Sequence, residues 1–177
     1  MTKGEGTNGP WSDLSADGAN LSVHDFVTKR ISQVMSALRR NVTLPYARSF
    51  GLSISEWRIL SLVAHAGVIA FSELVVQSTS DKAMVSRVVR ALEKRGLVTT
   101  RPETESSRKR IACEVTEAGA ALYARAIVVA KRQQAEVLLM LSVEERGQLH
   151  RILEKLQTHL DHAAPDIPLS AGDSDLD

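Results

Sequence analysis

One segment constrains the fold of this 177-residue chain more than any other, because its pattern changes from helical to alternating. From Asp81 to Arg95 the apolar side chains recur at i, i+3, i+4 and i+7, which predicts a helix, and Gly96 stands where a glycine commonly ends one. Residues 97–101 and 109–115 then alternate as short strands do, with a charged loop at residues 102–107. The segment therefore predicts a helix followed directly by a β-hairpin.

Helical patterns precede this segment. A single apolar stripe runs between about residues 23 and 48, where Pro45 predicts a kink or an early stop. Ser53 and Glu56 form a capping box that opens a helix ended by Gly67. A second short helix is expected at residues 72–77, and Ser80 in the turn behind it is a suitable N-cap for the helix at residues 81–95.

Two longer helices are expected after the hairpin. Thr116 is placed to cap a helix that reaches about residue 141. Ser142 and Glu145 form a second capping box, which opens a last helix with an apolar stripe. The chain is therefore expected to be mainly α with a small β-hairpin (α+β).

The charge of the chain is unevenly distributed. The net charge is only +1, but both ends are acidic, and residues 81–110 hold nine basic residues against four acidic ones. Such a patch indicates a polyanionic partner. The chain has one cysteine, no apolar run of the about 18–20 residues that cross a bilayer, and no signal peptide. We therefore expect a cytoplasmic protein with no membrane partner, no disulfide framework and no cofactor.

The basic helix at residues 81–95 is suited to the major groove of DNA, where the first turns of a helix can reach base edges. Its base-edge candidates are Lys82, Ala83, Ser86 and Arg87. Further along, phosphate contacts are expected from Arg90, Lys94 and Arg95. The turn before the helix and the hairpin complete the expected DNA-binding set with Ser80, Arg101, Arg108, Lys109 and Arg110.

These elements together predict a winged helix-turn-helix with a helical dimerisation region. The expected divisions are a disordered tail at residues 1–20, a dimerisation helix at residues 21–52, a DNA-binding lobe at residues 53–115, dimerisation helices at residues 116–162 and an acidic disordered tail at residues 163–177. Apolar stripes on the first and last helices exceed what one small lobe can cover, which favours a subunit interface.

Three segments resemble the MarR family of bacterial transcriptional regulators. Residues 53–60, Ser-Ile-Ser-Glu-Trp-Arg-Ile-Leu, resemble the entry to the family's second helix, usually Thr-x-x-Gln-Trp. Residues 91–98 match the end of its recognition helix, and residues 115–119, Val-Thr-Glu-Ala-Gly, match the Leu-Thr-x-x-Gly after the wing. The resemblance covers roughly residues 23–162. It implies a homodimer that binds double-stranded DNA at a pseudo-palindromic operator and responds to a small-molecule effector.

The wing departs from the family pattern. Where the family carries Asp-x-Arg, this chain has Ser107 and Lys109, although Arg108 and Arg110 flank that position. Lysine keeps the charge but lacks the planar fork of arginine. Wing contacts are therefore expected to be looser or shifted by one residue.

The resemblance also implies an effector site, because the family often binds small aromatic or phenolic acids between the dimer helices and the DNA-binding lobe. The residues near that junction are Tyr46, Arg48, Trp57, Arg58 and His65. An arginine could hold a carboxylate in a bidentate pair, with Trp57 as a wall for the ring. The competing interpretation places Trp57 in the core and Arg48 in solvent.

Two other candidate sites are less favoured. Cys113 shares an inward strand face with Ile111 and Val115, so a buried structural thiol is expected rather than a redox sensor. His159 and His162, with His150, have a spacing compatible with zinc, but solvent-facing histidines near a helix end are commoner.

The leading hypothesis is a homodimeric, sequence-specific DNA-binding regulator, more often a repressor, that a small ligand releases from its operator. No phosphate-binding loop, nucleophile elbow or zinc-protease motif occurs, so an enzyme is not expected. The alternative is a winged-helix protein-interaction module that does not bind DNA, supported only by the changed wing.

Overall fold

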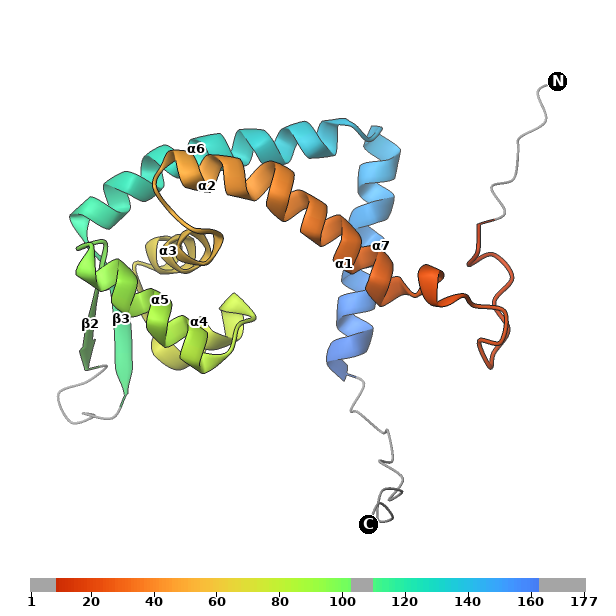
Figure 1. Cartoon of the computed structure of the whole chain (residues 1–177), viewed down its shortest axis with the longest axis horizontal. Coiled ribbons are helices and arrows are strands. Elements are labelled where there is room, and N and C mark those ends of the chain that lie inside the picture. Colours follow the sequence, from red (N-terminus) through yellow and green to blue (C-terminus); the bar gives the residue numbers. More distant parts are fainter. Residues whose placement is uncertain (1–8, 103–109, 163–177) are drawn as a thin grey trace, which may run out of the picture. The chain divides into compact units, whose positions relative to one another are not determined.

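The computed structural model describes residues 9–102 and 110–162 of the chain (Figure 1). These residues are mostly helical, with one small antiparallel sheet, so the expected mainly α fold with a small β element is confirmed. The chain divides into two compact units, and the boundary falls within α6 (Glu117–Leu139), where one unit ends at Gln133 and the other begins at Gln134.

The first helical stretch continues through its proline. A short 3-10 helix, η1 (Val23–Asp25), precedes α1 (Val27–Leu38), which passes through a π-helical turn, η2 (Arg39–Thr43), into α2 (Leu44–Ser49). Pro45 lies in the first turn of α2, where its missing N–H is tolerated. The expected early stop is therefore wrong, and the wider π turn stands where a kink was predicted.

The tails that were expected to be disordered are described only in part. Residues 1–8 and 163–177 lie outside the described residues. Residues 9–20 form turns, and the indole Nε1 of Trp11 donates to the backbone oxygen of Asp25 at 2.7 Å. This hydrogen bond joins the segment to η1.

Three helices and three strands follow as a winged helix-turn-helix lobe (Figure 1). The elements are α3 (Ile54–Ala66), β1 (Val68–Ala70), α4 (Phe71–Ser78), α5 (Lys82–Lys94), β2 (Val98–Pro102) and β3 (Ile111–Val115). The capping box at the start of α3 is confirmed, because the Ser53 hydroxyl accepts from the Glu56 N–H at 3.1 Å and the Glu56 carboxylate accepts from the Ser53 N–H at 2.8 Å. Gly67, with a φ of 75°, ends α3 as predicted.

The sheet has a third strand that the sequence patterns did not predict. β1 pairs antiparallel with β3, and the sheet order is β1-β3-β2, so β3 is central. Both edges of β3 are therefore hydrogen-bonded. The adjacent residues Ala112 and Cys113, which point to opposite faces of the sheet, are both buried. The predicted one-sided pattern is wrong at Ile111, which is 46% exposed.

The lobe has a continuous apolar core. α3 supplies Leu60 and Val63, and α4 supplies Leu74. From α5 come Val85, Val89 and Leu92. Its largest fully buried side chains are Leu60, Val63, Leu74, Ser78, Val85, Leu92, Val98 and Cys113. Gly96, with a φ of 68°, ends α5 in the left-handed conformation that glycine tolerates, as predicted.

The start of α6 packs closely on the start of β2. Thr116 caps α6 as predicted, because its Oγ1 accepts from the Gly119 N–H at 3.0 Å. The same Oγ1 donates to the Gly96 oxygen at 2.7 Å, and the Thr116 N–H donates to the Leu97 oxygen at 3.2 Å. A Cβ added at Gly119 would lie 1.9 Å from the Leu97 oxygen. The close approach therefore requires glycine.

The second unit contains the end of α6 and α7 (Val143–His162). Its capping box is also confirmed, because the Ser142 N–H donates to the Glu145 carboxylate at 2.7 Å and the Glu145 N–H to the Ser142 hydroxyl at 3.2 Å. None of the residues of α7 is buried, although the helix carries an apolar stripe that includes Ile152, Leu153 and Leu160. Among the described residues, no helix is long and apolar enough to cross a membrane.

Gly119→Ala is expected to destabilise the protein by about 1–3 kcal/mol, because the new Cβ meets backbone atoms that cannot move aside cheaply. Thermal and urea unfolding measure the loss. Gly147→Ala is the matched control. Gly147 lies in α7, and its nearest neighbour is the mobile end of Arg151 at 3.5 Å, so alanine there should stabilise by up to about 1 kcal/mol. Equal effects at the two glycines would contradict the packing argument.

Cys113 is expected to be unreactive in the folded protein. Burial raises the pKa of its thiol to about 11, from an ordinary 9.0, and the negative charge of Glu93 adds to the shift. At pH 8 the folded protein should therefore carry about a hundredfold less thiolate than an ordinary cysteine would. A chromogenic disulfide reagent should label the folded protein slowly and the unfolded protein at once. Rapid labelling without unfolding would contradict the assigned burial.

Candidate nucleic-acid interface

Helix α5 begins at Lys82, one residue later than predicted. Thr79 ends α4 in a left-handed conformation (φ 50°), and Asp81 is the N-cap of α5, its Oδ1 accepting from the Met84 N–H at 2.8 Å. Ser80 instead donates its hydroxyl to the Ser78 oxygen at 3.1 Å. The prediction that Ser80 caps the helix is therefore wrong, because its hydroxyl bonds back to the end of α4 while the Asp81 carboxylate meets a free N–H of α5.

One face of α5 is apolar and buried, and the opposite face is basic and exposed. Val85, Val89 and Leu92 are buried, while Val88, also predicted to face inward, is half-buried. The exposed residues of the DNA-binding set on this helix are Lys82, Ala83, Arg87, Arg90 and Lys94. Ser86 is half-buried. The helix thus presents cations at each of its turns to solvent.

At its C-terminal end, α5 is attached to α3 by an ion pair. Arg95 Nη1 lies 2.9 Å from Glu56 Oε1, and the two side chains are 36% and 17% exposed. Partial burial raises the pKa of Glu56, but hydrogen bonds from Ser53 and the charge of Arg95 outweigh this effect, so the pKa lies below its ordinary value. The structure therefore places Arg95, a phosphate candidate from the sequence, against a carboxylate of its own lobe.

The wing contributes fewer described cations than the sequence suggested. Arg101 of β2 donates from Nε to Glu114 Oε2 of β3 at 2.9 Å, which offsets its charge within the hairpin. Arg110 is exposed and immediately precedes β3. Arg108 and Lys109 lie outside the described residues.

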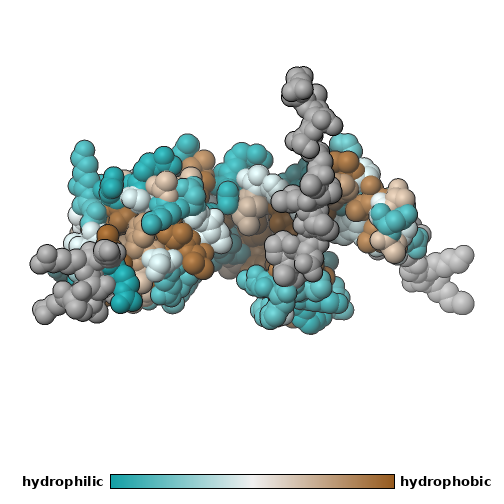
Figure 2. All heavy atoms as spheres, turned by 90° about the horizontal axis from the view of Figure 1, so that it is seen from below, coloured by the Kyte–Doolittle hydropathy of each residue, from teal (hydrophilic) through white to brown (hydrophobic). Residues whose placement is uncertain are grey.

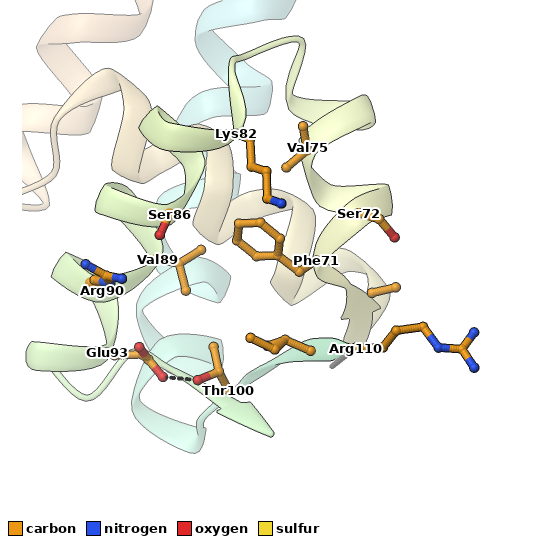
Figure 3. A pocket seen from close by; sticks show the side chains of 12 residues that line it. Phe71, Ser72, Val75, Lys82, Ser86, Val89, Arg90, Glu93, Thr100 and Arg110 are labelled. Atoms are coloured by element: carbon orange, nitrogen blue, oxygen red, sulfur yellow. Dashed lines mark hydrogen bonds between the residues drawn. The ribbon is translucent and has the colours of Figure 1, made fainter. Parts of the chain in front are cut away.

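A hollow of about 550 Å³ lies between α4, α5 and the wing. Figure 3 shows the Phe71 ring at its centre with the Lys82 amine beside it, and Val75 and Val89 from opposite helices. At the wing end, the Thr100 hydroxyl donates to Glu93 Oε1 at 2.5 Å. The lining residues are Ala70, Phe71, Ser72, Val75, Lys82, Ser86, Val89, Arg90, Glu93, Thr100, Arg110 and Ile111. Aromatic and aliphatic surface is therefore combined here with basic side chains.

The five residues expected to bind an effector differ in their burial and contacts. Tyr46 and Trp57 are buried and pack edge to face, with ring centroids 5.5 Å apart. Arg58 is half-buried and donates from Nη1 to the Ser78 oxygen at 3.2 Å. Arg48 and His65 are exposed. None of the five lines the hollow beside α5.

Tyr123 is an aromatic neighbour that the sequence patterns missed. Its ring stacks on Trp57 from α6, with centroids 6.0 Å apart and planes inclined by 23°. No local pattern could reveal this contact, because it joins two helices that are distant in the sequence.

The histidines of the last helix make local contacts. His150 Nδ1 lies 3.2 Å from Glu154 Oε2, and His162 Nδ1 lies 2.6 Å from the Thr158 oxygen. Within residues 9–102 and 110–162, no group of three or more histidine, cysteine or acidic side chains could hold a metal ion.

Known proteins resemble the chain in sequence and in fold. A family model described as the MarR family matches residues 52–109. The HTH-type transcriptional repressor Rv2887 of Mycobacterium tuberculosis is 30% identical over 106 residues, which cover 60% of this chain and 76% of that protein. Its crystal structure gives a TM-score of 0.55 at 25% identity and covers 75% of this chain and 95% of the other.

Other solved structures share the fold. A MarR/EmrR family transcriptional regulator from Acinetobacter sp. ADP1 has a TM-score of 0.71 at 26% identity, covering 81% of this chain and all of that one. NadR in complex with 4-hydroxyphenylacetate has a TM-score of 0.64 at 23% identity, covering 76% of this chain and 94% of that chain.

The named relatives are transcriptional regulators rather than enzymes, which confirms the prediction that the chain is not an enzyme. The residues that the family model matches include the basic helix α5. The chain belongs to the MarR family of transcriptional regulators.

Proposed function

We propose that the protein is a homodimeric repressor that binds a pseudo-palindromic operator and is released from it by a small aromatic or phenolic acid. The observation that carries this proposal is the exposed basic face of α5 beside the wing. Electrostatic attraction to phosphates and a helix that fits the major groove are the two requirements of such binding. The relative Rv2887 is named as a repressor, which favours repression over activation.

In the proposed complex, the first turns of α5 enter the major groove. Lys82, Ala83, Ser86 and Arg87 read base edges, and Arg87, at the middle of the exposed face, is suited to a guanine. Arg90 and Lys94 contact phosphates. The basic residues of the wing, Arg101, Arg108, Lys109 and Arg110, lie over the neighbouring minor groove, and Ser80 reaches the backbone before the helix.

Homodimerisation is supported by apolar faces that the single chain leaves uncovered. On α1, Val27, Ile31 and Val34 are 44%, 45% and 60% exposed. On α7, Ile152 and Leu153 are 56% and 50% exposed, and apolar surface remains visible between the polar regions in Figure 2. A second copy covers such faces and places two recognition helices about 34–36 Å apart, which matches half-sites one DNA turn apart.

The hollow beside α5 is the better supported effector site. It offers Phe71, Val75 and Val89 to an aromatic ring and the basic Lys82 and Arg90 to a carboxylate. Lys82, Ser86 and Arg90 also belong to the proposed DNA-binding set, so an effector here blocks DNA directly. NadR, a neighbour in fold, binds the phenolic acid 4-hydroxyphenylacetate.

The alternative effector site remains the junction near Tyr46, Arg48, Trp57, Arg58 and His65. It is less well supported, because Trp57 is only 7% exposed and its ring already packs on Tyr46 and Tyr123. A ligand there would have to displace aromatic contacts before it could bind.

The test of DNA recognition compares two arginines of α5. Wild-type protein first selects a duplex from a randomised library, and fluorescence anisotropy then measures its affinity for that duplex and for a shuffled one. Arg87→Ala should cost about 1–3 kcal/mol on the selected duplex and little on the shuffled one. Arg90→Ala should weaken binding to both alike and reduce the salt slope by about one.

Equal losses on both duplexes for Arg87→Ala would contradict its role at a base edge. A wild-type protein that selects no sequence, and whose weak binding does not depend on salt, would instead favour the protein-interaction module.

The effector proposal is tested by filling the hollow. A panel of aromatic and phenolic carboxylates is screened for release of the selected duplex from wild-type protein. Val75→Phe should abolish release by the active compound and retain DNA binding, because the larger ring occupies the ligand's space. Trp57→Phe is the matched variant for the alternative site and should leave release intact. The reverse pattern would place the effector at the aromatic junction.

A further inference from the structure

Three consecutive residues of α3 contact three different parts of the lobe. Glu56 forms the ion pair with Arg95, at the C-terminal end of the recognition helix, at 2.9 Å. Trp57 packs between rings from α2 and α6. Arg58 donates to the oxygen of Ser78, the last residue of α4, at 3.2 Å. One turn of α3 is therefore joined to the C-terminal end of α5 and to the end of α4, directly before the turn that leads into α5.

The contact of Arg58 adds a charged donor to the hydrogen bonds of the turn before α5. The Ser78 oxygen accepts from Arg58 Nη1 and also from the hydroxyls of Thr79 and Ser80, at 2.8 and 3.1 Å. Thr79 has the left-handed conformation, which costs a non-glycine residue energy unless its surroundings hold it there. Because Asp81 caps α5 directly after this turn, the turn determines where the recognition helix begins.

The contact of Glu56 fixes the other end. One carboxylate oxygen accepts from the Ser53 N–H at 2.8 Å and the other from Arg95 Nη1 at 2.9 Å, so both are committed. The side chain is held by the start of α3 and cannot follow Arg95 if α5 rotates. Ser78 and Arg95, the partners of Arg58 and Glu56, lie on either side of the 13 residues of α5 in the sequence.

We propose that Arg58 and Glu56 are positioning residues for DNA recognition, which set the orientation of α5 against α3 without touching DNA. The inference rests on the proposed function, since it assumes that α5 reads an operator. Base-edge hydrogen bonds require heavy atoms within a narrow distance range, whereas phosphate attraction tolerates a small rotation. Loss of either contact should therefore weaken specific binding more than nonspecific binding.

The principal test is Arg58→Met, which keeps an unbranched apolar stem and removes the donors. We expect the dissociation constant for the selected duplex to rise about tenfold, as for loss of one hydrogen bond from a charged donor. Binding to the shuffled duplex and the salt slope should not change. Arg58→Lys, which retains a donor, should recover part of the specific affinity. Arg125→Met, at an exposed arginine of α6 outside the proposed DNA-binding and effector sites, is the matched control and should change neither affinity.

The second anchor is tested by a double-mutant cycle. Glu56→Gln keeps the capping box and removes the charge, and Arg95→Gln removes the partner. Each single variant should weaken binding to the selected duplex about threefold, and the double variant no further, because they break the same contact. If Arg95 contacted phosphate instead, Glu56→Gln would strengthen binding to both duplexes, and Arg95→Gln would reduce the salt slope by about one.

The melting temperatures of the variants distinguish a positioning role from a simple loss of stability. Losses of affinity that are equal on both duplexes and follow the unfolded fraction would overturn the positioning role, as would an Arg58→Met variant that discriminates like wild type. If wild-type protein itself fails to discriminate, the proposed function fails and this inference with it. If wild-type protein discriminates and the variants discriminate equally well, this inference fails and the proposed function stands.

Discussion

The lobe depends on a backbone contact between the start of α6 and the start of β2. Thr116 donates to the oxygens of both Gly96 and Leu97 and caps α6 through Gly119. The end of the recognition helix, the start of the wing and the first turn of α6 thus meet within a few residues. The contact exists only because Gly119 has no side chain. This explains in physical terms why the motif after the family's wing ends in glycine.

Features set by neighbouring residues could be predicted from the sequence. Both capping boxes, the Gly96 terminus and the buried face of α5 depend on residues within one or two helical turns of one another, and the structure has all of them. The sequence pattern favoured Ser80 as the cap of α5, but Asp81 is an equally good cap and is the one observed. The left-handed conformation of Thr79, which the local pattern does not reveal, decides between them.

Features set by distant contacts could not be predicted. β1 has three residues, too few for an alternating pattern, and is a strand only because it pairs with β3. The stacking of Tyr123 on Trp57 and the anchoring of Arg58 at Ser78 likewise join separate elements. The family resemblance placed Arg58 near an effector site, and only the structure reveals its contact with the Ser78 oxygen.

The hollow beside α5 shares Lys82, Ser86 and Arg90 with the basic face of the helix. If the effector and DNA bind as proposed, a molecule in the hollow and a duplex on that face exclude each other sterically. The apparent affinity for DNA then falls in proportion to ligand concentration and reaches no plateau, because no ternary complex forms. Such a regulator responds over a range of concentrations set by the DNA it competes with, so strong operators need more ligand for release than weak ones.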